Sequence, residues 1–322
     1  MQLMCYKDIG MTKKYFFVVS IIFLILKSIL HFRKQQMIRT FFRRISRLFF
    51  RFYKREYGRY TILVKLFFPY LAPKSEKREI VRAYHNLKME VDSREYIQAM
   101  IYLFGNFEPP TIKFLEKYIK KGDLIFDIGA NVGYHTLIFS ELTGENGSVF
   151  AFEPEPDNYK TLKKNVDLNS LKNVICINKA LSDREETLNF YVSKSFNKGT
   201  HFLVYNPIQH LKDPIKIDVI PLSNFIKENN IKCIDFIKID VEGAEFEVIK
   251  GMEKSLIHFK PTLLVEINNE AQETHGKTSK SLKEYICGLG YDPYDILEDG
   301  NITESPVERI HNVENVAFIP RK

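Results

Sequence analysis

The 322-residue chain contains no tryptophan and only four cysteines, at positions 5, 176, 233 and 287. No two cysteines form a C-x-x-C pair, and none has the spacing of a metal site. Two of them lie in runs with the pattern of strands. We therefore interpret all four as core thiols of a protein in a reducing compartment.

The sequence also lacks two common phosphate-binding signatures. Gly129 and Gly133 are separated by three residues, so the third glycine of the dinucleotide-binding G-x-G-x-x-G pattern is missing. No Lys-Ser/Thr pair follows, which excludes a P-loop that would hold a triphosphate and magnesium. A ligand at this turn is therefore expected to lack a pyrophosphate or a triphosphate.

The turn itself lies between an expected strand and an expected helix. Residues 124–128 form a short apolar run, typical of a buried parallel strand. Apolar residues then recur at helical spacing up to Gly144, so the start of the helix faces the turn. Asp127 is a carboxylate at the carboxyl end of the strand, where open α/β sheets bind ligands.

A second acidic residue follows the next apolar run, residues 148–152. Glu153 is twenty-four positions after Gly129, where a carboxylate can accept hydrogen bonds from ribose hydroxyls. A nucleoside without a phosphate fits S-adenosylmethionine, whose sulfonium and amino groups also suit a neighbourhood with Asp127 and Glu153. An ordinary turn that binds nothing is the alternative.

Three motifs carry a family resemblance. They are Phe-Asp-Ile-Gly-Ala-Asn-Val-Gly at residues 126–133, Ala-Phe-Glu-Pro-Glu-Pro at 151–156 and Lys-Ile-Asp-Val-Glu-Gly-Ala-Glu at 238–245. In this order they resemble the FkbM family of S-adenosylmethionine-dependent methyltransferases, over residues 105–322. The resemblance implies that Asn131 joins Asp127, Gly129, Gly133 and Glu153 at the cofactor. It also implies that the acceptor is a hydroxyl of a sugar, a glycan or a similar small molecule.

Alternating strands and helices from residue 121 onward predict an α/β fold with a parallel sheet. Strands are expected at 124–128, 148–153, 174–178, 234–240, 262–267, 291–297 and 316–319. The resemblance makes this a Rossmann-like class I methyltransferase domain, with a mostly parallel seven-stranded sheet, helices on both faces and an antiparallel last strand. Before it we expect a linker and helical cap at 66–120, with helices at 96–104 and 111–119.

Two charged residues lie in the expected strand 234–240. Lys238 and Asp240 are two positions apart, so their side chains share one face near its carboxyl end. Buried charges are costly, so either the two form only a salt bridge, or Asp240 lies beside the reacting methyl group. Glu242 follows at the start of a helix as a third catalytic candidate, with helix capping as its alternative.

Other polar residues are weaker candidates. Asp183 is expected to meet the adenine amino group, although a turn-forming role is equally good. Asp240, Glu266 and Asn268 loosely resemble the ligands of metal-dependent O-methyltransferases, but a divalent metal is not favoured. His135 contacts a ligand or lies at the surface. Residues 193–214 are long for a plain connection and could form a substrate lid or a surface insertion.

The positive charge is concentrated near the N-terminus. Residues 1–65 contain fifteen lysines and arginines and two acidic residues, a net charge of +13 against +7 for the whole chain. Residues 15–26 form an apolar run, and residues 41–55 alternate aromatic and basic residues like an amphipathic helix at an anionic membrane. A nucleic-acid-binding tail or a helix packed on its own domain remains possible. We predict a membrane-associated arm with the catalytic domain in the cytoplasm.

These patterns predict an S-adenosylmethionine-dependent O-methyltransferase. The alternative is an inactive cofactor-binding scaffold that the arm recruits to a membrane, although a scaffold gives no reason to bury Lys238 with Asp240. A methyltransferase acting on nucleic acid is disfavoured, because the chain lacks the Asn/Asp-Pro-Pro-Tyr/Phe motif and residues 66–322 carry a net negative charge.

Overall fold

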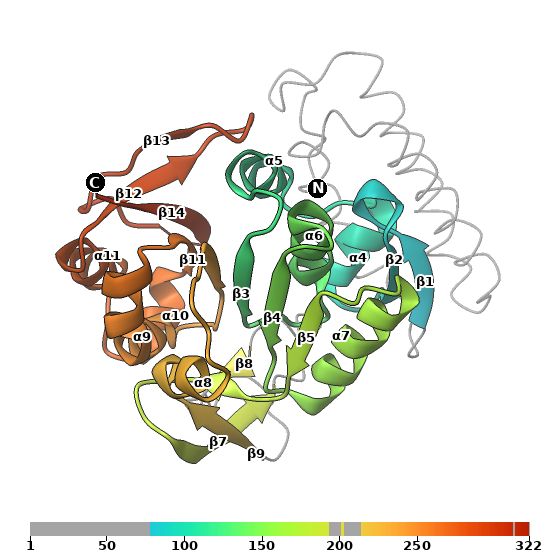
Figure 1. The fold of residues 1–322 in the computed structure, drawn as a ribbon, viewed down its shortest axis with the longest axis horizontal. Helices are drawn as coiled ribbons and strands as arrows, with labels where there is room; N and C mark the ends of the chain where they lie inside the picture. Colours follow the sequence, from blue (N-terminus) through green and yellow to red (C-terminus); the bar gives the residue numbers. More distant parts are fainter. Residues whose placement is uncertain (1–77, 193–200, 203–213, 312, 322) are drawn as a thin grey trace, which may run out of the picture. The chain divides into compact units, whose positions relative to one another are not determined.

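The computed structural model describes residues 78–192, 201–202, 214–311 and 313–321. They belong to one compact unit, Ser75–Lys322 (Figure 1). The predicted N-terminal arm lies outside the described residues, as does nearly all of the expected excursion at 193–214. Among the residues described, no helix is both long and apolar enough to cross a membrane.

The centre of the fold is an eight-stranded sheet in the order β13-β12-β14-β11-β10-β3-β4-β5. Its strands are β3 (Leu124–Ile128), β4 (Ser148–Phe152), β5 (Val174–Ile177), β10 (Phe236–Ile239), β11 (Thr262–Ile267), β12 (Tyr291–Ile296), β13 (Ile302–Glu304) and β14 (Glu314–Pro320). The pairs from β5 to β11 are parallel, whereas β14 is antiparallel to both neighbours, as predicted. The predicted count of seven strands is wrong, because a hairpin adds β13 beside β12.

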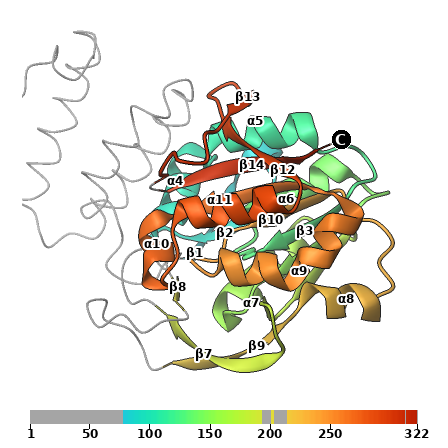
Figure 2. The same cartoon turned by 90° about the vertical axis from the view of Figure 1, so that its left-hand side faces the viewer.

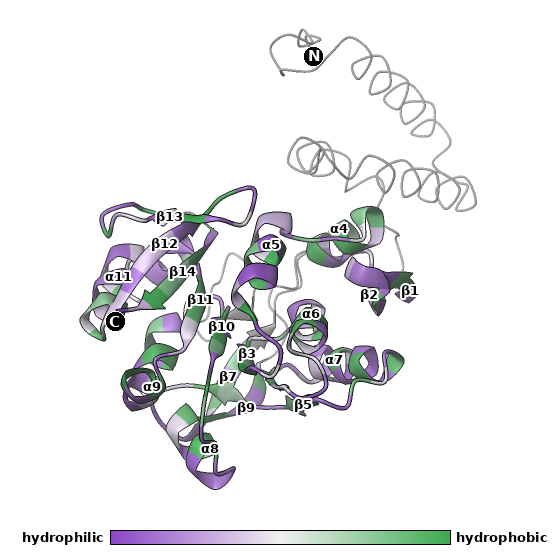
Figure 3. Ribbon diagram, turned by 45° about the horizontal axis from the view of Figure 1, so that its top comes forward, coloured by the Kyte–Doolittle hydropathy of each residue, from purple (hydrophilic) through white to green (hydrophobic). Residues whose placement is uncertain are grey.

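Helices cover both faces of this sheet. They are α4 (Tyr96–Phe104), α5 (Pro109–Tyr118), α6 (Tyr134–Thr143), α7 (Pro156–Leu168), α8 (Leu222–Glu228), α9 (Glu245–Phe259), α10 (Asn269–Thr274) and α11 (Ser279–Gly288). Figure 2 shows α9 and α11 running side by side. Figure 3 shows apolar colour in the central strands, while α8 is hydrophilic on its outer side.

Strand β10 shows why both faces need cover. The ring of Phe236 lies 6.3 Å from that of Phe114 in α5 and 5.9 Å from that of Phe139 in α6. Its neighbours Ile237 and Ile239 belong to the core cluster formed with α8, α9 and α11. Successive side chains of a strand point to opposite faces, so an apolar strand requires helices on each side.

The segment before the first sheet strand is more ordered than the sequence suggests. Strands β1 (Arg78–Arg82) and β2 (Lys88–Asp92) form an antiparallel hairpin around the 3-10 helix η2 (Tyr84–Asn86). This corrects the predicted linker, because Val81, Met89 and Val91 are buried. The predicted helices after it are confirmed as α4 and α5.

A small second sheet follows β5. It contains β6 (Ala180–Leu181), β7 (Glu186–Val192), β8 (His201–Phe202) and β9 (Ile215–Ile220), in the order β6-β9-β7-β8. The strands expected from the sequence do not include β9, although Ile215, Ile217 and Val219 alternate with polar residues. Helices α8 and α10 were also missed, since each is shorter than the periodicity needs.

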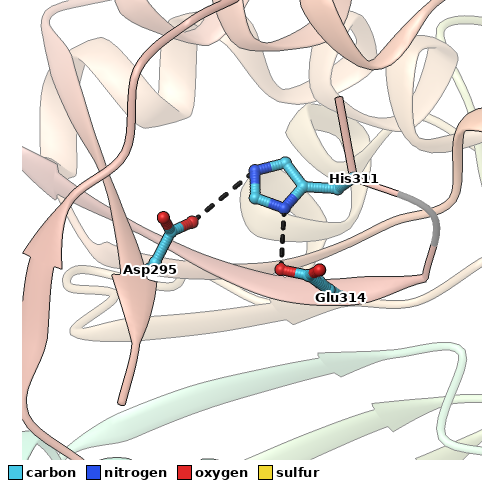
Figure 4. A group of neighbouring side chains, drawn as sticks. All are labelled: Asp295, His311 and Glu314. Atoms are coloured by element: carbon cyan, nitrogen blue, oxygen red, sulfur yellow. Dashed lines mark hydrogen bonds and ion pairs between the residues drawn. The ribbon is translucent and has the colours of Figure 1, made fainter. Parts of the chain in front are cut away.

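A cluster of ionisable side chains around the buried His311 joins the C-terminal strands (Figure 4). The His311 ring is fully buried between Glu314, at 2.9 Å from Nδ1, and Asp295, at 3.6 Å from Nε2. Arg309 pairs with both carboxylates. Removing one member of such a group is destabilising, because it leaves the remaining partners without a compensating charge.

We expect Asp295→Ala to lower the free energy of unfolding by about 1–3 kcal/mol, because it leaves His311 and Arg309 with one carboxylate between them. Asp292→Ala is the matched control on the same strand, where the carboxylate is half exposed and pairs with exposed Arg321. Urea titrations of both variants would measure the difference. Equal midpoints would show that the buried group contributes no more than a surface pair.

Candidate functional site

A cleft opens at the carboxyl ends of β3, β4, β10 and β11. It encloses about 880 Å³ of empty space, part of it open to solvent. The predicted residues that line it are Gly129, Asn131, Glu153, Asp240 and Glu242. Apolar side chains complete the walls, among them Ile97, Phe107, Phe152, Leu181 and Ile217. The size and mixed lining are typical of a small-molecule site.

The turn after β3 requires glycine at its first position. Gly129 has φ of +81°, and a Cβ there would lie 1.8 Å from the carbonyl oxygen of Asp240. The amide N–H groups of Gly129 and Ala130 both donate to the carbonyl of Phe152, at 3.0 and 2.9 Å. The turn is therefore packed between the ends of β4 and β10, with no room for a side chain.

Gly133 serves packing rather than the cleft. It has φ of +91°, and a Cβ would lie 2.6 Å from Cδ1 of Leu162 in α7. It is not among the residues that line the cleft. The missing side chain lets α6 begin close to α7, and the predicted place of Gly133 at the cofactor stays a prediction.

Glu153 closes one side of the turn. Its Oε2 accepts the N–H of Asn131 at 2.8 Å, and its Oε1 accepts the N–H of Glu155 at 2.9 Å. Burial raises the pKa of Glu153 to about 8 although these two N–H groups oppose the shift. Each carboxylate oxygen keeps a free lone pair, so the group can still accept hydroxyl hydrogen bonds in the cleft.

Asp127 lies behind the cleft and does not line it. Its side chain is fully buried, and Oδ2 accepts the hydroxyl of Thr136 at 2.5 Å. Burial raises its pKa, against the effects of Lys238 and Thr136. Oδ1 has no hydrogen-bond partner among the residues that the structure describes. Asp127 therefore supports the site from the layer beneath the ligand.

Lys238 and Asp240 form the salt bridge that the sequence left open, with Nζ 2.8 Å from Oδ2. Burial lowers the pKa of Lys238, but Asp240 and Asp127 outweigh it and raise the pKa overall. Lys238 is 2% exposed and does not line the cleft, whereas the Asp240 side chain is 30% exposed and does. The pair thus presents one oriented carboxylate to a ligand.

The loop after β10 carries two acidic residues with different surroundings. Glu245 is fully buried, and its Oε1 accepts the N–H groups of Gly243 and Val241 at 3.0 and 3.3 Å. Glu245 therefore holds the loop before α9, whereas the capping role that the sequence analysis considered for Glu242 is not seen. Glu242 has φ of +54° and lines the cleft without a hydrogen-bond partner among the described residues.

Two further carboxylates line the cleft. Glu108 precedes α5 with φ of +49°, and its side chain accepts Asn315 Nδ2 at 2.8 Å and lies 3.8 Å from His135 Nε2. Burial, then Asp240, raises the pKa of Glu108 to about 7. Glu266 from β11 lies on the same cleft. The sequence analysis missed Glu108, because no local pattern marks it.

The remaining candidates lie elsewhere. Asp183 does not line the cleft, and its carboxylate pairs with Lys250 of α9 at 2.6 Å. Asn268 accepts the N–H of Ala271 at 3.1 Å and caps α10. His135 is 9% exposed, so it is not a surface residue, and burial with Lys238 keeps its pKa well below the usual range.

Comparison with known proteins places this cleft within a described family. A family model described as "Methyltransferase FkbM domain" matches residues 127–293. Hexuronic acid methyltransferase AglP of Haloferax volcanii is 30% identical over 149 residues, covering 46% of this chain and 58% of the relative. 2-O-methyltransferase NoeI of Sinorhizobium fredii is 28% identical over 149 residues, covering 42% and 60%.

Other matches have lower identity. The 31-O-demethyl-FK506 methyltransferase FkbM of Streptomyces tacrolimicus is 26% identical over 163 residues, covering 42% of this chain and 61% of the relative. A crystal structure of methyltransferase FkbM from Methylobacillus flagellatus has 16% identity and a TM-score of 0.42, covering 71% and 55%. This chain thus spans about three fifths of the length of these three curated relatives.

The family match covers just over half of the 322 residues and includes the Gly129 turn, Glu153 and the loop from Asp240 to Glu245. The resemblance predicted from three motifs is confirmed, and the chain belongs to the FkbM methyltransferase domain family.

Proposed function

We propose that this protein transfers a methyl group from S-adenosylmethionine to a hydroxyl of a sugar, a glycan or a similar small molecule. The observation that carries the proposal is the meeting of the Gly129 turn, Glu153 and Asp240 in one cleft. The family match supports the reaction type. The names of two relatives, a hexuronic acid methyltransferase and a 2-O-methyltransferase, support a sugar-like acceptor.

The residues of the cleft fit a nucleoside-containing cofactor. The backbone of Gly129 allows close approach, since it carries no side chain at the mouth of the turn. Glu153 retains lone pairs for ribose hydroxyls, and apolar Phe152, Leu181 and Ile217 suit a purine ring. S-adenosylmethionine supplies a methyl group already bound to a sulfonium, which is a strong electrophile. The protein therefore has to supply mainly position and a proton acceptor.

Asp240 is suited to both tasks. Its Oδ2 is fixed by Lys238, so its carboxylate has a set direction before an acceptor arrives. Its exposed side faces a cleft that also contains Glu242, which can accept a second hydroxyl. An acceptor hydroxyl held by Asp240 is aligned for attack and can give up its proton as the new bond forms.

The first test concerns the cofactor. Glu153→Ala should weaken S-adenosylmethionine binding roughly ten- to a hundredfold, because it removes the acceptor for the ribose hydroxyls and leaves the N–H groups of Asn131 and Glu155 without a partner. Isothermal titration calorimetry would measure it, with exposed Glu145→Ala as the control. Glu153→Gln keeps the side-chain shape, so a folded Gln variant with weaker binding excludes a folding defect. Unchanged affinity in both Glu153 variants would contradict the role of Glu153.

The second test concerns turnover. Asp240→Asn keeps the shape but removes the proton acceptor, so kcat should fall by about 10²- to 10⁴-fold. Cofactor affinity should change little. Release of S-adenosylhomocysteine with a panel of sugar acceptors would measure the rate. Near-normal turnover in the variant would mean that Asp240 serves only as the salt-bridge partner of Lys238. If neither the wild type nor the variant releases S-adenosylhomocysteine, the protein is better described as an inactive scaffold.

We also propose that residues 1–60 attach the protein to a membrane with its catalytic domain in the cytoplasm. The support is the sequence alone: an apolar run followed by a heavier load of lysine and arginine than precedes it. The described domain carries no such span of its own. Attachment near a membrane would suit a lipid-linked glycan acceptor.

Deleting residues 1–60 should therefore move the protein from the membrane fraction to the soluble fraction of a cell lysate. A variant with glutamine at the basic positions 43, 44, 47, 51, 54 and 55 tests the electrostatic contribution separately. A truncated protein that still pellets with membranes would contradict the proposal. So would digestion of the catalytic domain by protease added outside intact cells.

A further inference from the structure

Three carboxylates converge in the cleft from three chain positions. Asp240 directly follows β10, Glu242 lies two residues further along the loop, and Glu266 is on the neighbouring strand β11. One oxygen from each lies within 4.8 Å of an oxygen of the other two. Oxygens bound to one ion at Mg²⁺ or Ca²⁺ distances are at most about 4–5 Å apart, so a single ion could reach all three.

The charges of this group are not balanced by protein cations. Lys238 pairs with Asp240, whereas Glu242 and Glu266 have no hydrogen bond or ion pair within the described parts of the chain. Glu108 adds another carboxylate to the same cleft, 3.8 Å from Nε2 of His135. Buried carboxylates are normally paired or bound to a cation.

A separate observation lies beneath the loop. The fully buried Glu245 accepts the N–H groups of Val241 and Gly243, the residues on either side of Glu242. Its Oε2 has no partner among the described residues. A fourth carboxylate that is buried and only partly satisfied therefore lies beneath the loop that carries Glu242.

The other three-ligand group is different. Asp295, His311 and Glu314 are equally close, but Arg309 pairs with both carboxylates and the His311 ring fills the space between them. Both of its carboxylates have an arginine partner, which Glu242 and Glu266 lack within the described residues. Of these two groups, the one in the cleft therefore contains carboxylates that lack a positively charged partner in the part of the chain that the structure describes.

We propose that Asp240, Glu242 and Glu266 bind a divalent, oxygen-preferring cation in the cleft. Three carboxylate ligands leave coordination positions open for water or for acceptor hydroxyls, and this second role rests on the proposed methyl transfer. Glu242 replaces Asn268 in the ligand set that the sequence suggested, because the Asn268 side chain caps α10. The sequence analysis did not favour a divalent metal, and the proposal departs from that preference.

The test is titration of the full-length chain with Mn²⁺, followed by electron paramagnetic resonance of the free ion. One Mn²⁺ should bind per chain, and Glu266→Gln and Glu242→Gln should each weaken it by at least about tenfold. Glu270→Gln is the matched control, four residues along and exposed on α10, and should bind like wild type. Thermal melting of each variant checks that it is folded.

Each outcome decides the proposal. Absence of stoichiometric Mn²⁺ binding overturns it, and so does binding that survives both Gln variants. If glucosamine binds in a Glu266-dependent way while Mn²⁺ does not, the carboxylates recognise an amine and the metal site is wrong. Calorimetry with S-adenosylmethionine on the same samples separates the two proposals. Cofactor binding without Mn²⁺ overturns only the metal, and Mn²⁺ binding without the cofactor overturns only the methyltransferase function.

Discussion

The site depends on the contact between the turn after β3 and the end of β10. The missing side chain of Gly129 lets the backbone of Asp240 come so close that any Cβ would collide with its carbonyl oxygen. The N–H of Asp240 donates to the carbonyl of Ile128 at 3.0 Å, so backbone bonds hold both ends in register. Since Ala130 and Gly129 also bond to Phe152, the ends of three parallel strands form one rigid edge.

Behind this edge is a layer of buried charge. Lys238 lies between Asp127 and Asp240, and Asp127 is held in turn by Thr136 at the start of α6. The cost of burying Lys238 is offset because both carboxylates favour its charged form. This layer fixes the direction of Asp240 without occupying the cleft. A site built this way is organised before a ligand binds, which lowers the cost of aligning an acceptor.

Local sequence patterns predicted the parts of the site that lie within one strand and its turn. The run at 124–128 matched β3, and two-residue periodicity correctly put Lys238 and Asp240 on one face. Chain order also placed Glu153 beside the turn, since β4 is parallel to β3. The sequence could not show that Glu242 faces the cleft whereas Glu245 is hydrogen-bonded beneath the loop. Both residues follow the same strand, and their surroundings depend on how the loop folds.

The rest depends on contacts between distant segments. Glu108 reaches the cleft because α5 packs on the sheet, and its partner Asn315 is 207 residues away. The hairpin of β1 and β2 was hidden because its buried residues gain their cover from α7, where Asn165 accepts the N–H of Glu90 at 2.7 Å. The periodicity of a single segment cannot predict contacts between residues that are far apart in the sequence. Glu108 and the β1–β2 hairpin are therefore features of the structure that the sequence analysis did not predict.

The most direct test of the central claim is calorimetric titration of the wild-type protein with S-adenosylmethionine and, separately, with NAD. The turn and Glu153 predict saturable binding of one S-adenosylmethionine per chain and no measurable binding of NAD, because the turn lacks the third glycine that receives a pyrophosphate. Binding of NAD, or failure of S-adenosylmethionine to bind a folded protein, would contradict the account.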